Sequence, residues 1–264
     1  MHSFFHRRMA MVTVSLALGA LALVASASHS WGGYHWARTG NPFTLKLGDN
    51  VSSVWDPYLA TTSSVWSISP VLDTAVVSGL GRSNCRATLG RVEVCNKLYG
   101  NNGWLGIAQI WVNGSHITQG TVKMNDTYFN TSAYDTPAWR TFVMCQEVGH
   151  TFGLDHQDEI FGNINLGTCM DYTNDPSGAL FGQLSNEHPN THDYEELDQI
   201  YAHLDTATTI KQTTVSKGNH NEDNLENRSE WGKEIRRDSR GHRSLHERDF
   251  GGGHKVFTFV IWAE

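Results

Sequence analysis

A carboxylate and two imidazoles stand close together in the stretch CQEVGHTFGLDHQDE. Gln146 and His150 are four residues apart, so on a helix they would lie one turn apart on the same face and could reach one ion. Gly153 lets the chain leave such a helix sharply, because glycine accepts left-handed backbone conformations, and His156 could then return as a further ligand. Glu147 follows directly after Gln146, where a carboxylate could hold a water molecule beside the ion.

These residue types predict metal-assisted hydrolysis. Zinc suits the set, because imidazole nitrogen is a preferred ligand and three protein ligands leave one position open. Bound zinc lowers the pKa of its water, and a carboxylate can take the proton as that water attacks a carbonyl. We therefore predict one catalytic Zn²⁺ held by His150, His156 and Gln146, with Glu147 as general base. The amide oxygen of Gln146 is a poorer zinc ligand than imidazole, and Asp155 is expected to shape the turn before His156.

The stretch resembles the zinc-binding signature of the metzincin endopeptidases, the group that includes astacins, serralysins, matrixins and snapalysins. Their pattern is H-E-x-x-H-x-x-G-x-x-H, and Gln146 stands where they have the first histidine. The resemblance covers roughly residues 30–205. Metzincins carry a methionine turn beneath the metal, and Met170 in GTCMDYT has the place of that structural methionine. In astacins and serralysins a tyrosine two residues later can reach the metal, which implies a catalytic role for Tyr172.

The resemblance also implies a fold, a substrate and an activity. The implied fold is α+β, with a twisted five-stranded, mostly parallel sheet packed on two long helices. Residues 105–112, LGIAQIWV, resemble the edge strand of the family, which pairs with a protein or peptide substrate bound as an extended strand. The implied function is a zinc-dependent endopeptidase. Gln146 leaves an alternative open, a non-catalytic pseudo-protease module that keeps the peptide cleft but binds zinc weakly or not at all.

Three segments have the apolar spacing of helices. Thr136 is a good N-cap and Pro137 a good first helical residue for the segment that carries the candidate ligands. The segments are VWDPYLATTSSVW (54–66), TPAWRTFVMCQEVGHT (136–151) and HDYEELDQIYAHLD (192–205).

Four further segments in this part of the chain are predicted to be strands. The last two are joined by Asn113-Gly114, a pair that favours a tight hairpin turn. The strands are FTLKLGD (43–49), VLDTAVV (71–77), IAQIWV (107–112) and HITQGTVKMN (116–125).

Residues 1–28 have the features of a secretory signal peptide. Arg7 and Arg8 precede an uncharged apolar run, Met9–Val24, and small residues follow near Ala27. The run is shorter than the roughly 20 residues that a membrane-spanning helix needs. We therefore predict a secreted protein, extracellular or periplasmic, that leaves the membrane after the signal is removed. The net charge of −7 argues against a nucleic-acid partner, because phosphate binding depends mainly on Lys and Arg.

Composition divides the rest of the chain into three parts. Residues 29–205 are predicted to form the catalytic domain. Residues 206–228 have almost no large apolar side chains and are predicted to be a linker. Residues 229–264 contain three strand-like runs, which predict a small C-terminal β-meander. Its last run, KVFTFVIWA, is too apolar to stand in water.

Four cysteines in an exported chain predict two disulfides, for which three connectivities are possible. We favour Cys85–Cys95, across a hairpin-like segment. That choice leaves Cys145–Cys169, which would join the helix of the candidate ligands to the residue before Met170.

Overall fold

The computed structural model describes residues 28–81, 84–210 and 225–263. Its centre is a nine-stranded mixed sheet with the strand order β3-β2-β4-β6-β5-β9-β8-β7, and β1 pairs with β6 outside this path. The predicted signal peptide up to residue 27 and most of the predicted linker lie outside the described residues. No helix in the described part of the chain is both long and apolar enough to cross a membrane.

The bounds of the elements agree closely with the predicted segments in the first 205 residues, except that the last predicted helix ends at residue 200 and not at residue 205. The strands are β1 (His35–Trp36), β2 (Phe43–Asn50), β3 (Leu72–Ser78), β4 (Val92–Lys97), β5 (Trp104–Asn113), β6 (His116–Asn125), β7 (Lys233–Arg236), β8 (Leu245–Gly251) and β9 (His254–Trp262). The helices are α1 (Asp56–Trp66), α2 (Asp126–Phe129), α3 (Pro137–His150), α4 (Thr191–Ile200) and the short 3₁₀ helix η2 (Arg228–Glu230).

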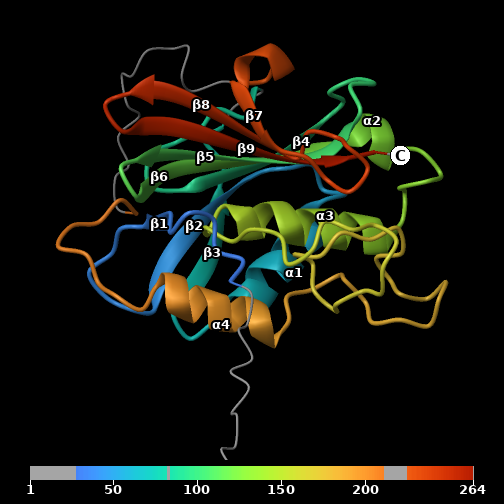
Figure 1. Cartoon of the computed structure of the whole chain (residues 1–264), viewed down its shortest axis with the longest axis horizontal. Coiled ribbons are helices and arrows are strands. Elements are labelled where there is room, and N and C mark those ends of the chain that lie inside the picture. Colours follow the sequence, from blue (N-terminus) through green and yellow to red (C-terminus); the bar gives the residue numbers. More distant parts are fainter. Residues whose placement is uncertain (1–27, 82–83, 211–224, 264) are drawn as a thin grey trace, which may run out of the picture.

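The helices α1, α3 and α4 lie together on one side of the sheet (Figure 1). The main core fills the space between them and the sheet. Helix α3 begins as predicted, because the Thr136 hydroxyl accepts a hydrogen bond from the Trp139 amide and Pro137 occupies the first turn. All residues from Arg140 to His150 are buried. The candidate ligands of α3 therefore sit in the interior rather than on an open helix face.

The expected five-stranded, mostly parallel sheet is only part of the observed sheet. The pairs β2–β3, β2–β4, β4–β6 and β1–β6 are parallel. The pairs β5–β6, β5–β9, β8–β9 and β7–β8 are antiparallel. The fold is therefore α+β with a mixed sheet, and the predicted hairpin at Asn113-Gly114 is present between β5 and β6.

The expectation that residues 105–112 form an edge strand is wrong for this chain. β9 pairs antiparallel with β5 along nearly its whole length, from Trp104 opposite Trp262 to Asn113 opposite His254. The physical reason is the apolar sequence of β9, whose residues from Val256 to Trp262 are all buried. A strand so apolar is stable only when its side chains are buried and its backbone is hydrogen-bonded on both sides. The side of β5 that faces away from β6 provides the backbone groups for one of these two pairings.

The C-terminal segment forms the predicted meander, because β7, β8 and β9 pair in sequence order. It shares one sheet with the preceding domain through β5 and is not set apart from it (Figure 1). A second apolar cluster, which includes Trp104, Trp231 and Val260, also joins the two parts of the chain. The residue boundaries of the predicted division remain a prediction.

Both predicted disulfides are present. Cys145–Cys169 connects α3 to the residue before Met170, across a separation of 24 residues. Cys85–Cys95 closes a shorter loop of 10 residues' separation at β4. The described chain has no free cysteine.

We predict that replacing both Cys145 and Cys169 with serine lowers the free energy of unfolding by about 3 kcal/mol, because the unfolded chain regains the entropy of an open loop of that length. Denaturant unfolding of the oxidised wild type and the double variant measures the difference. A change below about 1 kcal/mol would show that the bridge does not constrain the unfolded chain as expected.

Candidate functional site

His150 and His156 face each other at the end of α3. Their Nε2 atoms are 2.9 Å apart, and both side chains are buried. The other ring nitrogen of each is engaged, His150 Nδ1 with the Leu154 carbonyl at 2.9 Å and His156 Nδ1 with a Glu159 carboxylate oxygen at 2.7 Å. The loop from 151 to 155 brings the two rings together.

The chemistry of this histidine pair fits a cation. A carbonyl and a carboxylate can only accept, so both Nδ1 atoms carry the proton. Two neutral rings of that tautomer would point Nε2 lone pairs at each other, which is unfavourable without a positive species between them. A neutral Nε2 fixed by a partner on Nδ1 is the usual state of a histidine that binds a metal. Burial and the neighbouring His156 lower the pKa of His150 well below its usual range.

Gln146 lies one turn before His150, and its amide makes no hydrogen bond to the histidine pair. The side chain is fully buried, and its Nε2 donates a hydrogen bond of 2.9 Å to the Cys169 carbonyl. Its Oε1 has no hydrogen-bond partner among the described residues. The structure thus brings two of the three predicted ligands together, and the role of Gln146 as a ligand remains a prediction.

Glu147 is buried three residues before His150 on α3, and neither carboxylate oxygen has a side-chain hydrogen-bond partner in the described chain. Burial raises the pKa of Glu147 well above its usual range, and the backbone of Ala108 and Ile261 lowers it only in part. β5 passes close by because Gly106 has no side chain, since a Cβ there would lie 2.9 Å from the Oε1 of Glu147. The unpartnered buried Oε1 of Gln146 indicates a place for water or an ion.

Met170 and Tyr172 lie on either side of the buried turn after Cys169. A Cβ at Gly149 would come within 2.6 Å of the Met170 sulfur, so the glycine allows the methionine to pack directly on α3. The ring of Tyr172 packs edge-on against His156, with centroids 4.4 Å apart. Its hydroxyl donates to the Val260 carbonyl of β9 at 3.2 Å, and burial raises its pKa well above the usual range.

Gly153 follows α3 with a φ of +95°, a conformation that glycine accepts easily. A Cβ at this position would lie 2.1 Å from the Tyr34 carbonyl oxygen. The backbone conformation and the close approach of the N-terminal segment both require glycine there.

The C-terminal segment contributes two side chains that the sequence did not reveal as site residues. The ring of Phe259 stacks on His150, with centroids 4.2 Å apart and an interplanar angle of 11°. The guanidinium of Arg236 bonds to both Asp155 oxygens and pairs with Glu159 at 2.9 Å. The one sequence signal was the apolar run of β9. It showed that this strand had to be buried, but it did not identify the residues that would cover it.

Asp155, His156 and Glu159 also present three donor atoms within 4.8 Å of one another. Asp155 accepts the His156 amide at 2.8 Å, which is the turn-shaping role expected for it. Burial acts to raise the pKa of Glu159, but the hydrogen bond from His156 and the charge of Arg236 lower it overall. Arg236 fixes both carboxylates, and they in turn hold the backbone amide and the Nδ1 atom of His156.

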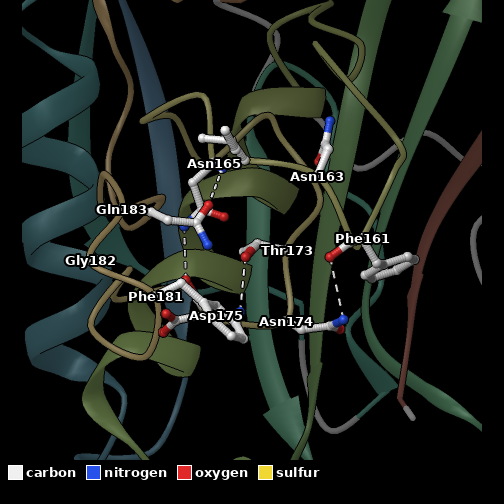
Figure 2. A pocket seen from close by; sticks show the side chains of 11 residues that line it. Phe161, Asn163, Asn165, Thr173, Asn174, Asp175, Phe181, Gly182 and Gln183 are labelled. Carbon is white, nitrogen blue, oxygen red and sulfur yellow. Dashed lines mark hydrogen bonds between the residues drawn. The ribbon is translucent and has the colours of Figure 1, made fainter.

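A cavity of about 650 Å³ opens beyond Tyr172. Phe161, at its wall, packs against Tyr172 with ring centroids 4.7 Å apart. Figure 2 shows its wall of amides and aromatic rings, in which Asn165 bonds to Gln183 and Asp175. The lining comes from three loop segments, 161–165, 173–175 and 181–183.

Comparisons with known proteins give little beyond a general likeness of fold. No protein-family model matches the sequence, and no curated protein matches it. Among solved structures, the chain is similar to high choriolytic enzyme 1, a hatching enzyme zinc-protease from the medaka fish Oryzias latipes. The TM-score is 0.37 and the identity 9%, over 64% of this chain and 94% of that chain. It is also similar to myroilysin, with a TM-score of 0.37 and 14% identity, over 64% of this chain and 84% of that chain. Likenesses this distant do not assign the site.

We predict that Gln146→His raises zinc affinity at least tenfold, because an imidazole nitrogen one turn before His150 is a stronger zinc donor than an amide oxygen. Gln146→Leu is the matched control, since it removes the amide without adding a donor. Competition with a chromophoric chelator measures both affinities. Equal affinity in Gln146→His and wild type would show that position 146 does not face the histidine pair.

Proposed function

We propose that this protein is a secreted zinc-dependent endopeptidase whose peptide-binding strand is covered by its own C-terminal segment. The observation that carries the proposal is the histidine pair, with two engaged Nδ1 atoms and two converging Nε2 atoms. The buried Glu147 precedes His150 by three residues on the same helix. The two disulfides suit an oxidising compartment. The motif and the methionine turn resemble those of metzincins, which is the family we propose.

His150 and His156 would hold the zinc ion, and Gln146 or Tyr172 would complete its ligands. Zinc, when bound, supplies a Lewis acid that polarises a carbonyl and makes water a nucleophile at neutral pH. Glu147 would take the proton from the attacking water and pass it to the leaving amine. The Tyr172 hydroxyl, released from Val260, would donate a hydrogen bond to the carbonyl oxygen as negative charge develops there.

β5 would position the substrate by pairing with it as an extended strand. In the described structure that position belongs to β9, which runs antiparallel to β5 and passes both Glu147 and His150. A peptide could reach the site only after β9 moves away from β5. The cavity beyond Tyr172, lined by aromatic rings, amides and the Asp175 carboxylate, would then take a substrate side chain.

A second candidate function is a non-catalytic module with the same framework. The residue at position 146 favours it, because the neutral amide oxygen of Gln146 is a poorer zinc ligand than an imidazole nitrogen. The two functions differ in activity once β9 is displaced, so experiments on β9 distinguish them.

We predict that Phe259→Pro raises peptidase activity at least tenfold over wild type. The Val260 amide bonds to Ser244, so the amide of residue 259 faces β5, and proline removes both that donor and the ring on His150. Lys255→Pro is the matched control, because residue 255 has the same orientation but lies at the far end of β9. Cleavage of a denatured protein substrate measures all three.

If Phe259→Pro folds and binds zinc but cleaves nothing, the endopeptidase proposal fails and the non-catalytic module stands. Activity that rises equally in Lys255→Pro would show that loosening the meander anywhere, rather than clearing the site, matters.

We further predict that adding Glu147→Gln to the Phe259→Pro variant lowers the rate at least about a hundredfold, the usual contribution of a general base. Zinc content should not change, because Glu147 is not expected to bind the ion. Glu195→Gln, on the exposed side of α4, is the control. Activity retained within tenfold would remove Glu147 from the mechanism.

A further inference from the structure

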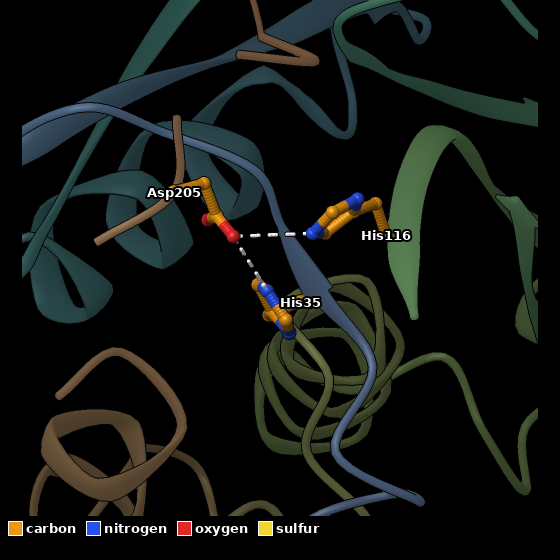
Figure 3. A group of neighbouring side chains, drawn as sticks. All are labelled: His35, His116 and Asp205. Atoms are coloured by element: carbon orange, nitrogen blue, oxygen red, sulfur yellow. Dashed lines mark hydrogen bonds and ion pairs between the residues drawn. The ribbon is translucent and has the colours of Figure 1, made fainter. Parts of the chain in front are cut away.

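A second group of histidines lies away from the histidine pair, where three segments of the chain meet. His35 belongs to β1, His116 begins β6 opposite it in parallel register, and His203 and Asp205 follow α4. His35, His116 and Asp205 offer donor atoms within 4.8 Å of one another. Figure 3 shows both imidazoles directed at the Asp205 carboxylate. No part of the proposed peptidase mechanism uses these residues.

Asp205 lies within 4 Å of all three imidazoles, and two of the imidazoles are in contact with each other. Oδ1 of Asp205 is 3.1 Å from His116 Nε2, 3.5 Å from His35 Nε2 and 3.8 Å from His203 Nε2. The Nε2 atoms of His35 and His203 are 3.1 Å apart. Two ligand atoms on one tetrahedral zinc, each at its usual bond length, are separated by roughly 3.3 Å. These four of the six separations among the donor atoms lie on both sides of that value.

The surroundings fix the donors in the orientation that a metal needs. His35 Nδ1 donates to the Gly33 carbonyl at 2.8 Å, which leaves its Nε2 as a lone pair. The second oxygen of Asp205, Oδ2, accepts from the Arg38 guanidinium at 2.9 Å and the Arg38 amide at 3.2 Å. Such contacts behind the ligands orient them and set the tautomer in metal sites.

Exposure differs across the cluster in a way that suits reversible binding. The side chains of His35 and Asp205 are 6% and 11% exposed, while those of His116 and His203 are 39% and 54% exposed. The buried pair is held by the fold, and the exposed pair can close over an ion that enters from solvent.

We propose that His35, His116, His203 and Asp205 form a second, structural zinc site. Three imidazole nitrogens and one carboxylate oxygen in a tetrahedral arrangement are a donor set that suits zinc. Four protein ligands leave no open position, so the site supports the fold and takes no part in hydrolysis. Its ion ties β1 and the β5–β6 hairpin to the chain that leaves α4.

The test is the zinc content and the zinc affinity of the full chain, with Zn²⁺ alone as ligand and Co²⁺ as a spectroscopic probe of tetrahedral geometry. The variants are His116→Ala and His203→Ala, whose exposed side chains can be removed without disturbing the core. His188→Ala, an exposed histidine elsewhere, is the matched control, and His150→Ala removes the other candidate site.

We expect His116→Ala and His203→Ala each to weaken one binding event at least tenfold or abolish it, to lose the matching tetrahedral Co²⁺ absorption, and to have a lower melting temperature in saturating zinc. His188→Ala should match wild type, and His150→Ala should keep this ion. Zinc retained by His150→Ala but lost by His116→Ala supports the site even if the chain proves to have no peptidase activity. Equal zinc binding in wild type, His116→Ala and His203→Ala, or zinc lost only in His150→Ala, overturns the proposal.

Discussion

β9 lies between β5 and β8 and buries both of its faces. Phe257, Phe259 and Ile261 pack into the core on the helix side of the sheet, and Val256 and Val260 pack into the cluster on the opposite side. A strand of this kind can be stable only in the middle of a sheet, since at an edge it would leave a row of hydrogen-bonding groups unpaired. Its pairing with β5 makes β5 an interior strand and joins β7, β8 and β9 to the same sheet.

The same pairing decides the state of the site. The Phe259 ring stacks on His150, and the Val260 carbonyl accepts a hydrogen bond from the Tyr172 hydroxyl. The Ile261 backbone lies against Glu147. With water excluded, the charged form of Glu147 is disfavoured, which is why its pKa is raised by burial. Arg236 adds a positive charge behind His156 through two carboxylates. The candidate site is thus built by residues from the middle of the chain and covered by residues from its C-terminal segment.

Local features of the sequence could be predicted because neighbouring residues determine them. Thr136 and Pro137 mark the start of α3, and Asn113-Gly114 marks a hairpin, since each acts within a few residues. The pairing of β5 with β9 could not be predicted in this way. An apolar strand shows that it must be buried, but its partner lies about 150 residues earlier in the chain, and no local pattern names it.

The same distinction between local and long-range determinants applies to the candidate site. His150, His156, Glu147 and Gly153 belong to one short motif, so their proximity was visible in the sequence. The direction of the Gln146 amide depends on the Cys169 carbonyl, which a loop of the fold delivers. His35, His116, His203 and Asp205 come from three separate segments, and their spacing follows no motif.

Gly149 is a position in α3 where even the single carbon atom of an alanine side chain has no room. A glycine inside a helix weakens it by roughly 0.5–1 kcal/mol relative to alanine, and replacing it is normally a simple way to make a protein more heat-resistant. Here a methyl group would come within 2.6 Å of the Met170 sulfur and 2.8 Å of the Trp66 ring. The helix that carries the candidate ligands must therefore stay intrinsically weak, and its rigidity has to come from the tryptophan, the methionine and the disulfide that enclose it.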